Sequence, residues 1–170
     1  MKLSTAIGAT AAAVTLSGCG FADYLGATRA YNYAVIQHVS SGGKGGAFET
    51  NTPGIGIGSE APFKASKYAA GVEAGVYNNP EDVRAPYAVA YVERDMLENR
   101  PRRLRFGAFA GFAKFPTKAD DSNLAFGDYV LTGGLQMTVS TVGPHEFRVR
   151  MSPGLNDSGS TLTLSSNIKF

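Results

Sequence analysis

Two side chains near the start of the chain have the types and spacing that acyl-transfer chemistry needs. His38 and Ser40 are two residues apart, and in a strand this spacing puts both side chains on one face. A histidine oriented by a carboxylate can take the proton of a serine hydroxyl, which then attacks an acyl carbon. Ser40 would then be the nucleophile, His38 the general base, and Glu49 or Glu73 the orienting acid. The alternative is structural: a histidine at the rim of a strand, followed by loop serines.

Cys19 offers a third reactive group, the thiol of the single cysteine in the chain. The positive start Met1-Lys2 and a mostly apolar run over residues 3–15 precede the tetrapeptide Leu16-Ser-Gly-Cys19. This arrangement resembles the signal peptide and lipobox of bacterial lipoproteins, and the run is too short to span a membrane. The resemblance implies cleavage before Cys19 and lipidation of its thiol by a palmitate-type diacylglycerol. Gly20 in place of aspartate implies sorting to the outer membrane; the alternatives are an ordinary secretory signal and an uncleaved segment.

Composition and spacing argue against several other kinds of site. The net charge of +2 is too small for the basic field of a nucleic-acid-binding protein, and one cysteine excludes an internal disulfide or a cysteine-based zinc site. The two histidines, His38 and His145, lie far apart in the sequence, so we expect no metal and no cofactor. Acidic residues at 120–121 and 156–157 could hold a surface calcium ion, but solvated loops explain them equally well. Residues 40–46 are glycine-rich without a following helix, which excludes a phosphate-binding loop.

Eight segments alternate apolar and polar residues with the period of two that is typical of strands. An even number of strands favours closure, because a closed barrel has none of the unpaired edges of an open sheet. The sequence therefore predicts an all-β fold, a single eight-stranded antiparallel up-and-down β-barrel of the transmembrane kind, over residues 28–170. A signal peptide (1–18) and a tether (19–27) precede it. The expected strands are residues 28–39, 54–58, 67–77, 85–93, 103–113, 128–139, 146–152 and 160–170.

The polar faces of these strands combine charges with glycines, as where Glu73 lies between Gly71 and Gly75. In a lipid-embedded barrel the apolar face meets hydrocarbon and the polar face fills the lumen, whereas a soluble lipocalin-like barrel reverses both. Small residues leave room for long side chains inside, which favours the lipid-embedded orientation. Because a lumenal charge without a partner is costly, we expect ion pairs between two sets: Arg103, Arg105, Arg148 and Arg150 with Glu73, Asp128 and Glu146.

The connections between the expected strands divide into two groups. If the tether and the C-terminus are periplasmic, four connections face the cell exterior: residues 40–53, 78–84, 114–127 and 153–159. The opposite turns are residues 59–66, 94–102 and 140–145. Longer loops at the outer end are typical of outer-membrane barrels.

Three stretches resemble known outer-membrane proteins. The amphipathic closing segment Ser160–Phe170, which ends on an aromatic residue, resembles the last strand of bacterial outer-membrane β-barrels. The pair His38 and Ser40 resembles that of the outer-membrane lipid A deacylases of the PagL type, eight-stranded barrels that use His, Ser and Glu. In that family the pair lies in a late strand and precedes Asn, whereas here it lies in the first strand and precedes Ser41. The wider order of His38, residues 49–56, 74–78, 87–91 and 107–111 resembles small outer-membrane barrels of proteobacteria and their phages.

These observations lead to three hypotheses about function. The favoured one is a monomeric, lipid-anchored outer-membrane protein without catalysis, surrounded by outer-membrane lipid, whose outer loops contact a surface ligand. In a phage, such a protein could alter the host surface. The second is a lipid A or phospholipid acyl hydrolase that depends on His38, Ser40 and Glu73, and the third is a periplasmic lipocalin-like lipid carrier. A channel is not expected, because side chains fill the lumen of an eight-stranded barrel.

Overall fold

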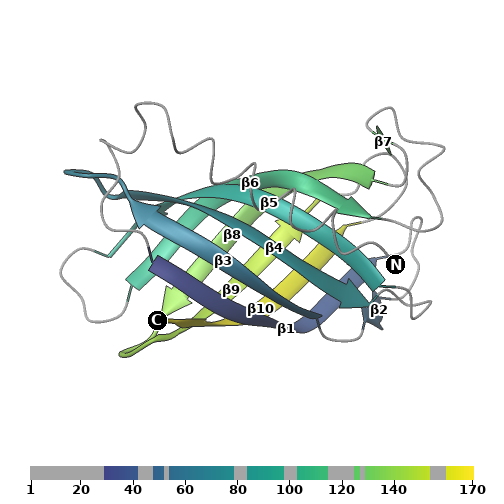
Figure 1. Ribbon diagram of the computed structural model, residues 1–170, viewed down its shortest axis with the longest axis horizontal. Helices are drawn as coiled ribbons and strands as arrows, with labels where there is room; N and C mark the ends of the chain where they lie inside the picture. The colour runs from purple at the N-terminus through teal and green to yellow at the C-terminus, as the bar shows by residue number, and fades with distance from the viewer. Residues whose placement is uncertain are drawn as a thin grey trace.

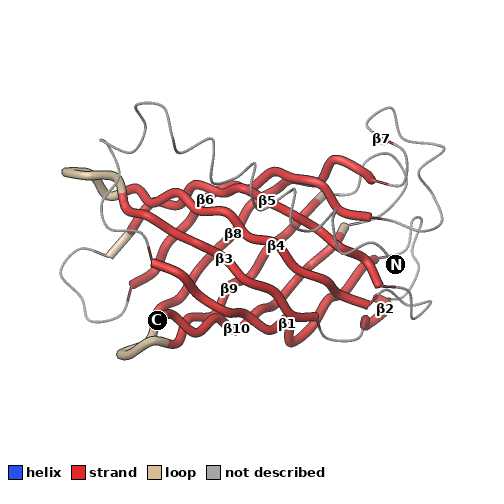
Figure 2. Tube along the Cα trace, viewed as in Figure 1, coloured by secondary structure: helices blue, strands red, loops and turns tan. Residues whose placement is uncertain are grey.

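The computed structural model of the chain is built almost entirely of antiparallel strands (Figures 1 and 2). It describes residues 29–41, 48–51, 54–78, 84–97, 103–114, 125–126, 129–153 and 160–170. The strands are β1 (Arg29–Ser41), β2 (Phe48–Asn51), β3 (Gly54–Pro62), β4 (Tyr68–Asn78), β5 (Arg84–Asp95), β6 (Arg103–Lys114), β7 (Ala125–Phe126), β8 (Tyr129–Ser140), β9 (His145–Ser152) and β10 (Thr161–Lys169). No helix in these ranges is long and apolar enough to cross a membrane.

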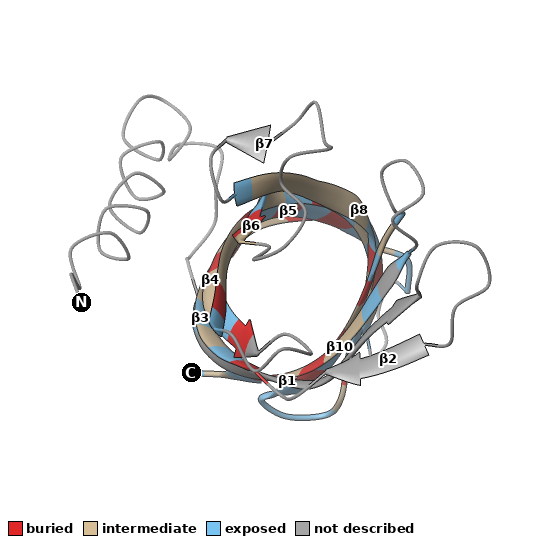
Figure 3. Ribbon diagram, turned by 90° about the vertical axis from the view of Figure 1, so that its right-hand side faces the viewer, coloured by how far each residue is buried: buried red, intermediate tan, exposed pale blue. Residues whose placement is uncertain are grey.

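Eight of the strands in the described ranges close into a barrel. The order of hydrogen-bonded neighbours is β10-β9-β8-β6-β5-β4-β3-β1, and β10 pairs with β1 to complete the ring. Among the described strands, β2 pairs only with β1 and β7 only with β8, so neither belongs to the ring. Figure 3 looks along the barrel and shows the ring. The all-β, eight-stranded up-and-down prediction is therefore confirmed.

The predicted strands match the observed ones closely, with two kinds of difference. β3 continues to Pro62, four residues beyond its expected end, because its second half pairs in register with β4 as far as Ala69. β2 and β7 form inside segments that were expected to be loops, where they continue the pairing of β1 and β8 beyond the ring. Such short extensions carry too few residues for alternation to reveal them.

A register shift interrupts β1. Tyr33 pairs with Asn167 of β10, but after a shift between Val35 and Gln37 the even-numbered His38 pairs with Thr163. The pairing of β1 with β10 therefore changes by one residue at this point, as it does at a β-bulge.

The two ends of the barrel differ. The hairpin end, at the left of Figure 1, holds the turns Phe63–Lys67 and Thr141–Pro144 together with Phe170. The Phe170 N–H donates to the Ala30 carbonyl over 3.2 Å, which ties the C-terminus to the start of β1. The opposite end, where β2 and β7 lie, is called the loop end here.

Side chains divide between the two faces of the wall as the lipid-embedded orientation predicts. Large apolar side chains are exposed on the outside, among them Ile55 at 73% and Leu135 at 62%. The buried polar and charged residues all belong to inward-facing positions, and in Figure 3 buried residues alternate with more exposed ones along the strands of the ring. A lipocalin-like barrel would show the opposite distribution.

Candidate functional site

The lumen on the side of the hairpin end is filled by ionised side chains from six strands. All except Lys169 are less than a tenth exposed, and the set balances four carboxylates against four cations: Glu60, Glu73, Glu93 and Glu146 against Arg105, Arg148, Arg150 and Lys169. Each comes from an inward position of an alternating strand, which explains why the sequence can place so many charges inside without losing the apolar exterior. We call this set the lumenal ion network.

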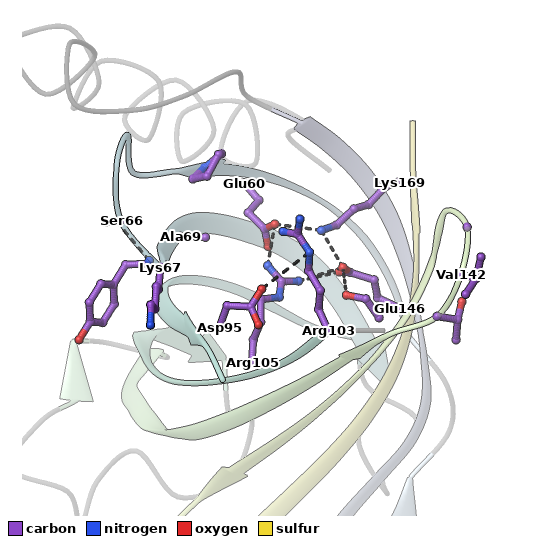
Figure 4. Close-up of a pocket in the computed structure, with 15 residues that line it drawn as sticks. Glu60, Ser66, Lys67, Ala69, Asp95, Arg103, Arg105, Val142, Glu146 and Lys169 are labelled. Atoms are coloured by element: carbon purple, nitrogen blue, oxygen red, sulfur yellow. Dashed lines mark hydrogen bonds and ion pairs between the residues drawn. The ribbon is translucent and has the colours of Figure 1, made fainter. Parts of the chain in front are cut away.

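Four members of the network form a closed ring of alternating charge, drawn in Figure 4. Arg105 Nη1 lies 2.7 Å from Glu60 Oε1 and Arg105 Nη2 lies 2.9 Å from Glu146 Oε2. Lys169 Nζ closes the ring, at 2.9 Å from Glu60 Oε1 and 2.8 Å from Glu146 Oε1. The ring joins β3, β6, β9 and β10, so Lys169 connects the closing strand to the opposite side of the β1–β10 seam.

Glu73 neutralises two arginines at once, deeper in the lumen. Its Oε2 lies 2.5 Å from Arg148 Nη1, and its Oε1 lies 2.5 Å from Arg150 Nη1. Tyr87 also donates its hydroxyl to Glu73 over 3.3 Å. Both carboxylate oxygens are therefore engaged, and β4 is linked across the lumen to β9.

Glu93, which is fully buried, connects this cluster to the ring. Gln136 donates to its Oε1 over 2.8 Å, Thr138 donates to the same oxygen, and Arg105 Nη1 lies 3.3 Å from Oε2. Arg148 Nε in turn donates to Thr138 over 3.1 Å. A buried charge is tolerated when it is paired and hydrogen-bonded in this way.

Tyr91 is the aromatic centre of the lumen. Its hydroxyl donates to Glu60 over 3.2 Å and accepts from Arg148 over 3.2 Å. The Arg148 guanidinium also lies 4.4 Å from the centroid of the Tyr91 ring, and that of Arg150 lies 5.2 Å from the centroid of Phe109. These cation–π contacts pack the arginine planes against the rings, so the ionic and aromatic side chains fill the lumen together.

The prediction of lumenal ion pairs is confirmed for Arg105, Arg148, Arg150, Glu73 and Glu146. It was wrong for Arg103, whose side chain is 63% exposed and lies 3.7 Å from Asp95 at the strand end. The other expected partner, Asp128, lies outside the described residues.

Sequence reasoning missed Glu60, Glu93, Tyr91 and Lys169. The alternation of inward and outward residues could have identified three of them. Glu93 and Tyr91 are separated by even numbers of residues from buried Val89, and Lys169 lies two residues from buried Asn167. Glu60 was missed because it was assigned to a turn.

The hairpin end also has a recess of about 350 Å³. Its lining includes Glu60, Arg105, Glu146 and Lys169 of the ion ring together with Lys67, Asp95 and Val142 (Figure 4). Among the described residues, no group of three or more histidine, cysteine, aspartate or glutamate side chains could hold a metal ion.

The structure places the predicted catalytic residues only in part. His38 lies in β1 opposite Thr163 of β10 and Asn51 of β2, and Ser40 lies opposite Thr161 and Glu49. Glu73, the expected orienting acid, is engaged by two arginines. Cys19, the expected lipidation site, lies outside the described residues.

The described outward positions of the barrel wall carry ionisable residues only near the strand ends. Where outward side chains of the strands are described, the ionisable ones are Arg84, Arg94, Lys114 and His145, each within the first or last two residues of its strand. Arg84 and Arg94 of β5 bracket an apolar stretch of outward positions. Ten residues at ~3.3 Å each, tilted by about 40°, rise ~25 Å, which matches the apolar band of a membrane barrel.

These features define the class: a small, closed, eight-stranded barrel of the outer-membrane type, with a charge-filled lumen and an apolar exterior. No protein-family description matches the chain, and no curated protein matches it. Among solved structures, the crystal structure of Neisserial surface protein A is similar, with 17% sequence identity, a TM-score of 0.57, and coverage of 85% of this chain and 97% of that one. This likeness shows the fold.

A second solved structure is Ail, the attachment invasion locus protein of Yersinia pestis, in complex with the heparin analogue sucrose octasulfate. It is 12% identical, with a TM-score of 0.36, and the match covers 84% of this chain and 97% of that one.

Proposed function

We propose that the chain is a small outer-membrane β-barrel lipoprotein that serves a structural or surface-binding role and is not an enzyme. The observation that carries the proposal is the distribution of side chains: ionised residues are paired inside, and apolar residues are exposed around the outside. In water this arrangement would expose large apolar areas and bury many charges, whereas in a bilayer the apolar wall meets hydrocarbon. The fold shared with Neisserial surface protein A supports an outer-membrane location.

The position of β1 supports the lipid anchor. β1 begins at the hairpin end, where Arg29 pairs with Glu60 and Ala30 accepts from the C-terminal residue. Cys19 precedes Arg29 by ten residues, which reach at most ~35 Å. An acylated Cys19 can therefore enter the membrane leaflet nearest the hairpin end, and this end is then periplasmic. The loop end faces outward and offers its loops to a surface ligand; in a phage, this would alter the host surface.

Membrane extraction of Cys19→Ala, combined with a heat-modifiability gel, tests the proposal. The variant should stay in the outer membrane without its lipid, because the barrel wall itself meets hydrocarbon, and its mobility should shift on boiling. Release into the soluble periplasm would refute a lipid-embedded barrel. Metabolic labelling with palmitate should mark the wild type and leave Cys19→Ala unlabelled; an unlabelled wild type would refute lipidation.

An acyl hydrolase is the second function to test, since His38 and Ser40 both belong to β1 and the register pairs Ser40 with Glu49 of β2. Because Glu73 already binds Arg148 and Arg150, Glu49 is the better orienting acid of the two that the sequence offers. Ser40→Ala should abolish any change in lipid A acylation that the wild type causes in cells, with Ser41→Ala as the matched control. If lipid A acylation with Ser40→Ala were the same as with the wild type and with Ser41→Ala, the hydrolase would be excluded.

A further inference from the structure

Two cations lie on the outer face of the barrel wall at the loop end, on adjacent strands. Arg84 begins β5 and Lys114 ends β6, and the last aligned pair between these strands is Tyr87 with Ala113. Continued by one residue, this register puts Lys114 opposite Pro86, two residues from Arg84. Diagonal neighbours of this kind are roughly 7–8 Å apart in a sheet, so both cations can reach one anionic group.

The neighbours of these cations show that they point away from the lumen. Ala85 and Ala113, the adjacent residues, face inward and are only 1% and 4% exposed. Phe112, two residues from Lys114 on the outer face, is 44% exposed, and Tyr129, which pairs with Lys114, is 37% exposed. The cations therefore lie at the loop-end margin of the apolar wall, beside an aromatic ring.

This position fits a lipid headgroup. A cation within the hydrocarbon is costly, whereas at the level of the headgroups its charge meets phosphate. Arginine and lysine both form charge-assisted hydrogen bonds with phosphate oxygens, and tyrosine is favoured where apolar and polar surroundings meet.

We propose that Arg84 and Lys114 form a binding site for a phosphate group of lipid A in the leaflet at the loop end. The choice of lipid A rests on the proposed function, which turns the loop end toward the outer leaflet, where this phosphorylated glycolipid resides. Two cations on neighbouring strands match a headgroup with concentrated phosphate charge better than they match a headgroup with a single dispersed charge. Tyr129 lies against the same headgroup from the side of β8.

The hairpin end supplies a matched control. Arg94 also points outward, from the other end of β5, but its guanidinium lies 5.8 Å from the ring centroid of Tyr68. The outward residues paired with it on the adjacent strands are Tyr68 and Phe106, neither of which carries a charge. Removal of Arg94 changes the net charge as removal of Arg84 does, without affecting the proposed site.

Binding of bis-phosphorylated lipid A to the purified full-length chain in detergent micelles, measured by native mass spectrometry, tests the site. Arg84→Gln and Lys114→Gln should each weaken binding by about fivefold and the double variant by about 25-fold, because each cation contributes separately to the attraction of a phosphate. Arg94→Gln should bind as the wild type does. Dephosphorylated lipid A should bind the wild type as weakly as bis-phosphorylated lipid A binds the double variant.

Three results would overturn the site: wild-type affinity in the double variant, an equal loss in Arg94→Gln, or equally tight binding of phosphatidylglycerol by the wild type. A heat-modifiability gel on each variant shows that the barrel is folded, so weak binding cannot be attributed to misfolding. The measurement uses purified protein, and its failure is therefore distinct from a failure of outer-membrane localisation, which the extraction of Cys19→Ala reports.

Discussion

The lumen has two halves with different chemistry. Toward the hairpin end lies the lumenal ion network, with its eight paired charges. Toward the loop end, the described inward side chains carry no charge: Tyr77, Ala85, Tyr87, Val89, Phe109, Gly111, Ala113, Val130, Thr132 and Ser152. Tyr87 and Phe109 lie at the boundary, where they contact Glu73 and Arg150. A charged half and an uncharged half thus share one wall of eight strands.

This difference separates two tasks. The ion network ties together strands that are far apart in the sequence, as where Arg150 of β9 meets Glu73 of β4, so it fixes the shape of the barrel near the hairpin end. The described inward side chains of the other half carry no charge, and this half lies next to the connections that would meet a ligand. We infer that stability is concentrated in the charged half, which leaves the loop end tolerant of change.

Among the tests of this comparison, Glu73→Gln should have the largest effect on stability. The substitution leaves Arg148 and Arg150 without their shared carboxylate in a buried site, and breaking a buried ion pair from one side typically costs about 3–5 kcal/mol. The free energy of unfolding, measured by urea titration of the refolded barrel in micelles, should fall by this amount. Circular dichroism is the suitable signal because the chain has no tryptophan.

The control for Glu73→Gln is Arg103→Gln, which removes a charge from an exposed side chain at the strand end. Exposed ion pairs contribute about 0–1 kcal/mol, so its unfolding free energy should stay close to that of the wild type. Similar losses in both variants would mean that the network does not concentrate stability in the lumen.

Gly71→Ala should lower the unfolding free energy less than Glu73→Gln does, and it also tests the charged half. A methyl group at Gly71 would meet the ring and hydroxyl of Tyr91 and lie 2.7 Å from the Ser59 carbonyl oxygen. Overpacking of this kind typically costs about 1–3 kcal/mol, and it displaces the hydroxyl that links Glu60 to Arg148. Gly133→Ala is the matched control, because the atom nearest to the added methyl group, the Phe109 carbonyl oxygen, lies 3.1 Å away. If both substitutions lowered the unfolding free energy equally, the Tyr91 side chain would move aside without a loss of stability.

The fold could be predicted from the sequence to a large extent because alternation is local information. β6, from Arg103 to Lys114, shows it most clearly, since charge and glycine occupy one face and Leu104, Phe106 and Phe112 occupy the other. The shift in β1 between Val35 and Gln37 could not be predicted, because a bulge depends on how β1 pairs with β10, at the far end of the chain.

The network was predicted in outline, but its connections were not. Charge balance led to the pairing of arginines with Glu73 and Glu146, whereas the closed ring through Lys169 depends on which inward residues a barrel brings to the same height. That height follows from the stagger of the strands, which no short stretch of sequence contains. Glu60 shows the limit most clearly, since it lies in a segment with the composition of a turn and becomes a ring member only because β3 continues to Pro62.

The smallest effects sharpen the comparison, because one chemical change can be made in both halves. Thr138 is fully buried in the charged half, where its hydroxyl donates to Glu93 and accepts from Arg148. Thr132 lies in the uncharged half, where its hydroxyl is 3.3 Å from that of Ser152. Hydrogen bonds to charged groups contribute about 1.5–3 kcal/mol and neutral ones about 0.5–1.5 kcal/mol. Thr138→Val should therefore lower the unfolding free energy more than Thr132→Val does in the same urea titration. If Thr132→Val were the more damaging of the two, stability would lie toward the loop end, and the loops would be part of the barrel's support.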